Sequence, residues 1–185
     1  MRINLKSGLL TGCLVFLAAA YAGAQGNADS HAGHAQVTAG SDAPHLVQTV
    51  RDATRQYLDI NNAIAAGYGP LFGCVSGSDH GAMGIHYVNP SLLNGTVDAA
   101  HPPALIYEPS NGKMTLVGVE FIVDAATWLK SNAAPPVLDG QVFLLVDAPN
   151  RFTVPAFFEL HVWAWRDNPQ GAYVDWNNHV SCDRQ

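Results

Sequence analysis

The chain has 185 residues, of which nine are basic and fifteen acidic, and its formal net charge is −6. The few basic residues form no cluster, which argues against nucleic acid and anionic membrane surfaces as partners. The length suits one domain with a sizeable core and leaves the oligomeric state open.

Residues 1–24 have the pattern of a secretory signal peptide. Arg2 and Lys6 supply positive charge, residues 9–20 are apolar, and Ala22-Gly23-Ala24 offers small residues for cleavage. No later apolar run is long enough to span a bilayer. We therefore expect a secreted or periplasmic protein. The alternative is a lipoprotein anchored through Cys13, but the apolar run continues past that cysteine.

Residues 25–42 are rich in Ala, Gly, Ser and His and lack apolar periodicity, which predicts a flexible leader. His31 and His34 lie in this leader. They are either part of a solvated linker or a weak, mobile site for copper or zinc. A single domain is expected to follow over residues 43–185.

An amphipathic helix is expected to open this domain. Asp42 can cap it, Pro44 suits its first turn, and Gly67 can end it. Its apolar residues alternate spacings of four and three, which places them on one helical face. They are Leu46, Val50, Ala53, Tyr57, Ile60 and Ile64.

The rest of the chain is predicted to form mainly strands. Residues 104–108 and 114–123 flank Asn111-Gly112, a hairpin signal, so they should pair antiparallel. A short helix is expected at 125–131, with Trp128 and Leu129 buried. Further strands are expected at 83–88, 142–146, 152–158, 159–166, 172–176 and 179–182. The predicted class is α+β, one N-terminal amphipathic helix followed by a mainly antiparallel, curved sheet or small barrel.

Two cysteines, Cys74 and Cys182, remain once the signal segment is removed. In an exported chain an even pair predicts one disulfide, here between the start of the strand region and the C-terminal tail. A paired-thiol metal or redox site has no C-x-x-C spacing to support it.

Three predicted strands each carry one metal-ligating residue among apolar neighbours: His86, Glu120 and His161. Because alternate residues of a strand share a face, His86 is expected on the same face as Gly84 and Val88. By the same rule Glu120 shares a face with Leu116 and Gly118, and His161 shares one with Glu159, Trp163 and Trp165. A buried carboxylate is costly unless it is paired or bound to metal. These three residues are therefore predicted to bind a divalent transition metal, Zn, Fe, Mn or Cu. Whether the protein is an enzyme stays open. In an enzyme, Glu159 or Tyr87 would transfer protons, with His179 near the site.

Other interpretations compete with the metal site. Each strand histidine can be a satisfied core residue, and Glu120 can pair with Arg166 or Arg151. Glu159 and Glu108 stand at strand ends, where solvation is expected. The main alternative function is a metal-free binding module that encloses an apolar or aromatic ligand between Trp163, Trp165 and Phe side chains. A structural envelope protein without a small ligand is a third possibility.

The motifs M-G-I-H-Y-V-N-P (83–90), L-V-G-V-E-F (116–121), E-L-H-V-W-A-W-R-D-N-P (159–169) and D-W-N-N-H-V-S-C (175–182) resemble those of a family of small exported bacterial proteins. The resemblance spans roughly residues 50–182. It implies an exported single domain, and the family lends no established activity or catalytic residues.

Overall fold

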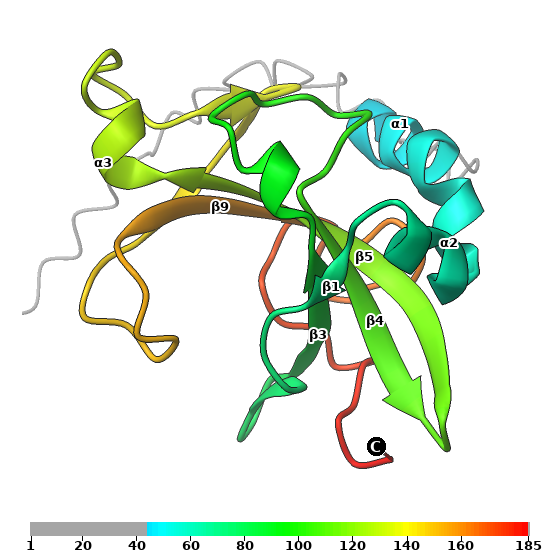
Figure 1. Ribbon diagram of the computed structural model, residues 1–185. Helices are drawn as coiled ribbons and strands as arrows, with labels where there is room; N and C mark the ends of the chain where they lie inside the picture. Colours follow the sequence, from blue (N-terminus) through cyan, green and yellow to red (C-terminus); the bar gives the residue numbers. More distant parts are fainter. Residues whose placement is uncertain (1–43, 185) are drawn as a thin grey trace, which may run out of the picture. The chain divides into compact units, whose positions relative to one another are not determined.

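The computed structural model describes residues 44–184. The expectations for the signal peptide, the leader and the Asp42 cap lie outside this range. Three helical segments come first, α1 (His45–Thr54), the 3₁₀ turn η1 (Arg55–Leu58) and α2 (Ile60–Ala65). The remaining elements are β1 (Gly69–Pro70), β2 (Val75–Gly77), β3 (Gly81–Val88), η2 (Pro90–Leu92), β4 (Ala104–Ser110), β5 (Lys113–Asp124), α3 (Ala125–Trp128), β6 (Val137–Leu138), β7 (Gln141–Val142), β8 (Leu144–Val146) and β9 (Phe157–Val162) (Figure 1).

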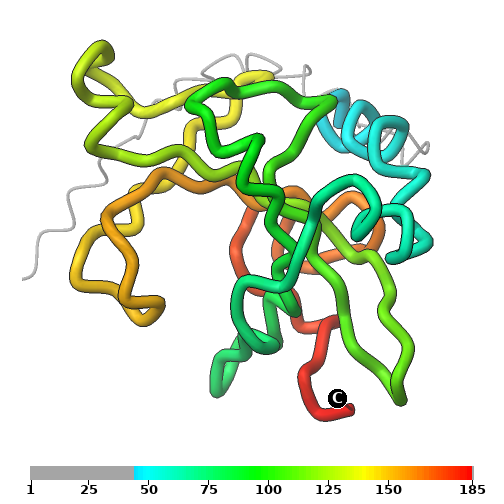
Figure 2. Tube along the Cα trace, viewed as in Figure 1, coloured from blue at the N-terminus to red at the C-terminus, as the bar shows by residue number. Residues whose placement is uncertain are grey.

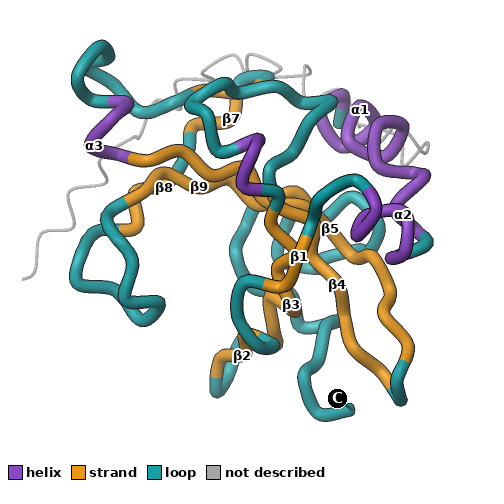
Figure 3. Tube along the Cα trace, viewed as in Figure 1, coloured by secondary structure: helices purple, strands orange, loops and turns teal. Residues whose placement is uncertain are grey.

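The main sheet has the order β1-β3-β4-β5-β9-β8, and every pairing within it is antiparallel. β2 pairs with β3 beside β1, and β6 pairs with β7 as a separate ribbon. Figure 3 shows β3, β4, β5 and β9 as the long central strands, with loops joining them at both ends. The α+β class is confirmed. In the described part the sheet is open, so the barrel form of that prediction is not seen.

The helices cover one face of this sheet. Leu46, Val47 and Val50 of α1 pack into the larger core, which also contains Val119 and Phe121 of β5. Two hydrogen bonds fasten the helical segment: the Arg51 guanidinium donates to the Ala164 carbonyl, and Trp165 Nε1 donates to Thr54 Oγ1 at 2.9 Å.

The expected single helix is in fact broken. Its N-terminal apolar face is buried as predicted, but the chain tightens into η1 at Arg55 and restarts after Asp59, whose side chain accepts the Asn61 N–H. Asp59 is a good helix cap, so a new helix begins there. Ile64, expected on the buried face, is half exposed.

The opposite face of the sheet carries a smaller core, made of Ala82, Ile106, Val117, Trp163 and Val180. The C-terminal segment reaches this part of the molecule and runs beside the β4–β5 hairpin (Figure 2), where Asn111 N–H donates to the Arg184 carbonyl at 2.8 Å. The predicted disulfide between Cys74 and Cys182 is confirmed and ties residues 108 apart in sequence. No helix within residues 44–184 is long and apolar enough to cross a membrane.

A β-bulge at Val117 changes which residues of β5 share a face, so the predicted faces of this strand are partly wrong. Ile106 is paired with Gly118 and Tyr107 with Leu116, so Val117 is the extra residue. Its carbonyl accepts from the N–H groups of Trp165 and Arg166 at 3.0 Å. Leu116 therefore turns to the larger core with Val119, away from Gly118 and Glu120. Strict alternation failed here because a bulge shifts the phase of a strand by one residue.

The C-terminal strand predictions were partly wrong. β9 starts at Phe157 and ends at Val162, whereas residues 152–156, 172–176 and 179–182 form turns and loops. Between the last two ranges, Asn177 makes an isolated bridge to Ala82. After Val162 the chain bends, so Trp165 packs on the helix side while Trp163 stays on the other. The short helix α3 exists, but Leu129 is half exposed rather than buried.

Candidate metal centre

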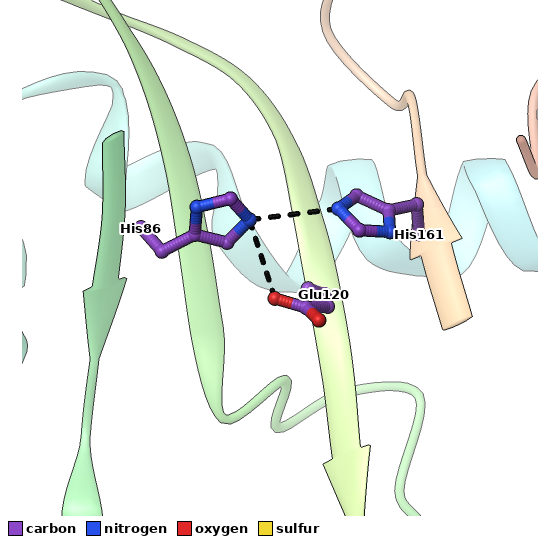
Figure 4. A group of neighbouring side chains, drawn as sticks. All are labelled: His86, Glu120 and His161. Carbon is purple, nitrogen blue, oxygen red and sulfur yellow. Dashed lines mark hydrogen bonds and ion pairs between the residues drawn. The ribbon is translucent and has the colours of Figure 1, made fainter. Parts of the chain in front are cut away.

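Three strands of the sheet bring His86, Glu120 and His161 together. Glu120 on β5 is paired directly with His161 on β9, and directly paired residues point to the same face. His86 on β3 is two strands from β5 and shares this face through its partner Ile106, which in turn faces Gly118. Figure 4 shows both imidazole rings directed at one another, with the Glu120 carboxylate beside the Nε2 atom of His86.

Ala104 of β4 makes this approach possible. Two inter-strand spacings separate β3 from β5 by about 9.5 Å. The side chains of His86 and Glu120 must therefore meet above β4. The β4 residue directly opposite Glu120 is Ala104, fully buried, with only a methyl group to occupy that space.

The ligand atoms are close enough for a single ion. His86 Nε2 lies 3.5 Å from His161 Nε2 and 3.3 Å from Glu120 Oε2. One nitrogen or oxygen from each of the three residues lies within 4.8 Å of the others. In a tetrahedral zinc site with bonds of 2.0–2.1 Å, ligand atoms are about 3.3 to 3.4 Å apart. The two distances from His86 Nε2, to His161 and to Glu120, are close to that spacing.

Burial sets the charge state of the cluster. The exposed fractions of His86, Glu120 and His161 are 6%, 4% and 1%. Burial, assisted by the nearby His161, lowers the pKa of His86 to about 3, so this imidazole is neutral and its lone pair is available to a metal. Burial and the neighbouring Glu159 raise the pKa of Glu120 well above its usual value. A divalent cation would stabilise the ionised carboxylate.

His161 is held from several sides. Its ring is stacked on Trp163, with centroids 6.1 Å apart and an interplanar angle of 23°. Gly118 makes room for Trp163, because a Cβ at that position would lie 3.2 Å from the indole and 2.9 Å from the Val162 carbonyl oxygen. The other ring nitrogen, Nδ1, is buried without a hydrogen-bond partner in the described chain, and Asp175 Oδ1 is 3.6 Å away. Metal-binding histidines usually direct their second nitrogen at such a carboxylate.

Glu159 belongs to the same neighbourhood, which corrects its expected solvation. It is 5% exposed, and its carboxyl group is near enough to that of Glu120 for the two to affect each other's pKa. Burial raises the pKa of Glu159, although the nearby His161 opposes the shift. With His161 and Asp175 it forms a second group of three possible ligands within 4.8 Å. Two acids in contact in a dry site favour one shared proton or a bound cation.

A cavity of about 600 Å³ opens onto the cluster, and His86, Glu120 and Glu159 are among its lining residues. Most of its wall is apolar: Leu71, Phe72, Met83, Val88, Leu93, Ile122, Val123, Trp128, Phe152, Val154, Pro155 and Phe157. A smaller hollow of about 400 Å³ is lined by His161, Glu159 and Asp175, among others. The cluster is therefore accessible from a preformed pocket.

Other predicted participants lie elsewhere. Tyr87 is on the opposite face, its ring against Tyr107 with centroids 5.2 Å apart, because neighbouring residues of a strand point to opposite sides. His179 is exposed and has its Nδ1 3.2 Å from the Asp167 carbonyl oxygen. Neither Trp163 nor Trp165 lines the cavity beside His86 and Glu120.

The proposed arginine partners of Glu120 are engaged by other groups. Arg166 pairs with Glu108, and Arg151 lies over the rings of Phe152 and Trp176. Glu108 also accepts from Ser181 N–H at 3.0 Å and is only partly exposed. Asp175 was not identified from the sequence, because it lies in a loop where no periodicity points toward the site.

Comparisons of the chain with protein-family models, curated proteins and solved structures give no significant match. The resemblance to a family of exported bacterial proteins stays a prediction.

Proposed function

We propose that this protein is an exported metal-binding protein in which His86, Glu120 and His161 hold one divalent transition metal ion, Zn, Fe, Mn or Cu. The observation that carries the proposal is the approach of three ligand atoms from three strands to within metal-ligand spacing, inside a dry part of the sheet. Two imidazoles and one carboxylate form a donor set common to catalytic zinc and non-haem iron sites.

The position of the cluster supports a reactive centre over a purely structural one. Structural zinc sites are closed by four protein ligands, whereas catalytic ones keep a position for water or substrate. Here three ligands come together, and two of them, His86 and Glu120, line a cavity. The metal would supply Lewis acidity there. Glu159, which lines the cavity beside Glu120, is the group best placed to accept or return a proton.

Export rests on separate observations. The Cys74–Cys182 disulfide fits an oxidising compartment, and residues 1–24 have the signal pattern. N-terminal sequencing of the protein from a periplasmic or culture-medium fraction should begin at Gln25. A lipid-modified Cys13 at the N-terminus would instead establish a lipoprotein.

Elemental analysis of the untagged full-length chain after export tests the metal site. We expect about one equivalent of metal in the wild type and in the leader variant His31→Ala/His34→Ala. The variants Glu120→Gln and His86→Ala/His161→Ala should lose it, while His101→Ala, at an exposed histidine paired with Asp98, should retain it. Circular dichroism separates ligand loss from unfolding. Folded wild type that takes up none of the four metals after reconstitution would overturn the proposal.

A further inference from the structure

The cavity above the cluster is built by loops that are distant in sequence. Its wall combines Leu71 and Phe72, which follow β1, with Leu93 after η2, Trp128 of α3, and the 152–155 segment before β9. Four separate segments therefore surround one opening beside the predicted metal ligands. Figure 1 shows α3 next to β9.

Apolar side chains of this wall remain accessible to solvent. Leu71, Leu93 and Phe72 have exposed fractions of 51%, 45% and 37%. Phe72 is stacked on Phe152, with ring centroids 5.5 Å apart, so two aromatic rings from different loops make one surface. Exposed apolar groups that line a cavity mark a surface that a ligand can cover.

The charges of the cavity define what it can accept. Of the described residues that line it, none is Lys or Arg, so no side chain offers an ion pair to a phosphate, sulfate or carboxylate group. The ionisable groups on its wall are His86, Glu120, Glu159 and Asp124. A divalent ion would balance the charges of Glu120 and Glu159. The remaining acid, Asp124, is exposed to solvent and accepts a hydrogen bond from the Thr127 N–H. With the charges of Glu120 and Glu159 balanced, the occupant that suits this field carries no net charge.

The size and polarity of the cavity narrow the class of ligand further. About 600 Å³ lies within the range of pockets that enclose a drug-sized molecule. Besides the ionisable groups, the polar side chains on the wall are Asn94, Thr127, Ser131 and Asn132. A ligand with a ring system and one or two polar atoms would bury its apolar surface there. Each Å² removed from water contributes about 25 cal/mol of favourable free energy.

We propose that this cavity binds an uncharged, aromatic or alicyclic small molecule whose hydroxyl or carbonyl oxygen reaches the metal held by His86, Glu120 and His161. This inference rests on the proposed metal site and assigns its substrate class. The rings lie against the Phe72–Phe152 surface, and the oxygen occupies the coordination position that the three protein ligands leave open.

Cobalt(II) is the suitable probe because its visible absorption reports coordination. The full-length protein is loaded with Co(II) and titrated with 2-naphthol, which has an aromatic body and one oxygen. Naphthalene, which lacks the oxygen, and naphthalene-2-sulfonate, which is charged, serve as matched probes. We expect 2-naphthol to bind and to shift the cobalt spectrum. Naphthalene should bind without a shift, and the sulfonate should bind at least tenfold more weakly.

Variants locate the binding surface. Phe72→Ser/Phe152→Ser removes the stacked pair and should weaken 2-naphthol binding at least tenfold while the cobalt spectrum of the free protein is kept. Leu145→Ser, a half-exposed apolar residue that lines no part of this cavity, is the control and should bind as wild type does. Tryptophan fluorescence provides a second measure of binding, since Trp128 lies on the wall.

The outcomes separate the two proposals. If cobalt binds but 2-naphthol leaves its spectrum unchanged, the substrate assignment is wrong and the metal site stands. Tight binding of the sulfonate would also overturn the assignment. If no cobalt binds to the folded protein, the metal site fails, and the oxygen-to-metal contact fails with it.

Discussion

Asp175 Oδ1 lies 3.6 Å from Nδ1 of His161, on the side of the ring opposite the nitrogen that faces His86. This carboxylate is placed to fix the orientation and tautomer of the imidazole. The distance is longer than a hydrogen bond, so metal binding is expected to draw the ring and the carboxylate together.

Asp175→Asn should weaken metal affinity about tenfold to a hundredfold, the usual effect of removing a partner of a metal-bound histidine. Because Asp175 is partly exposed, little stability should be lost. Competition with a chelator of known affinity measures the change. Asp167→Asn, at an exposed acid, is the control. Unchanged affinity in Asp175→Asn would show that this carboxylate does not support the site.

Ala104→Val tests whether a small residue on β4 is needed for His86 to reach Glu120. The added methyl groups would occupy the space above β4 and should reduce metal affinity at least tenfold, with an overpacking penalty of about 1–3 kcal/mol in stability. Chelator competition and urea unfolding measure the two effects. Ala63→Val, at a fully buried alanine of the larger core, should lower stability without changing metal affinity. Equal metal affinity in both variants would contradict the role of Ala104.

Glu120→Gln should make the metal-free protein less sensitive to pH. Because burial raises the pKa of Glu120 in the folded state, the folded chain holds this proton more tightly than the unfolded chain. The contribution of protonated Glu120 to the free energy of unfolding is fully present at pH values below the pKa of this group in the unfolded chain. It is lost as the pH rises toward the pKa of Glu120 in the folded chain, at no more than about 1.4 kcal/mol per pH unit.

Urea unfolding in the presence of EDTA between pH 5 and 8 measures this difference. The stability of wild type should fall relative to Glu120→Gln as pH rises, whereas bound metal should remove the trend. Parallel pH profiles for the two metal-free proteins would contradict the prediction. Glu108→Gln and Asp52→Asn are unsuitable controls because Glu108 pairs with Arg166 and Asp52 with Arg55, so Asp167→Asn, at an exposed acid, is used instead.

Removal of the disulfide should destabilise the fold without emptying the metal site. Cys74 and Cys182 close a long loop, and the chain-entropy model gives about 4–5 kcal/mol for a loop of roughly 100 residues. The Cys74→Ser/Cys182→Ser variant should therefore unfold at much lower urea concentration. Metal content of its folded fraction should stay near that of wild type, since neither cysteine belongs to the ligand group.

Sequence patterns were enough to predict the helix face at residues 46–50, the β4–β5 hairpin, the disulfide pair and the three residues of the cluster. These follow from local rules: apolar periodicity, a turn dipeptide, an even cysteine count and the rarity of ionisable residues between apolar strand neighbours. Each rule concerns residues close in sequence or the count of one residue type.

Several of the groups that surround that cluster could be identified only from the three-dimensional fold. The bulge at Val117 turned Leu116 away from Glu120, and the bend after Val162 separated Trp165 from Trp163. The fold brought Asp175 to His161 and buried Glu159, which was expected to be solvated. The position of a bulge, the path of a loop and the bend of a strand depend on contacts between segments that are distant in sequence. A pattern within one segment therefore does not predict them.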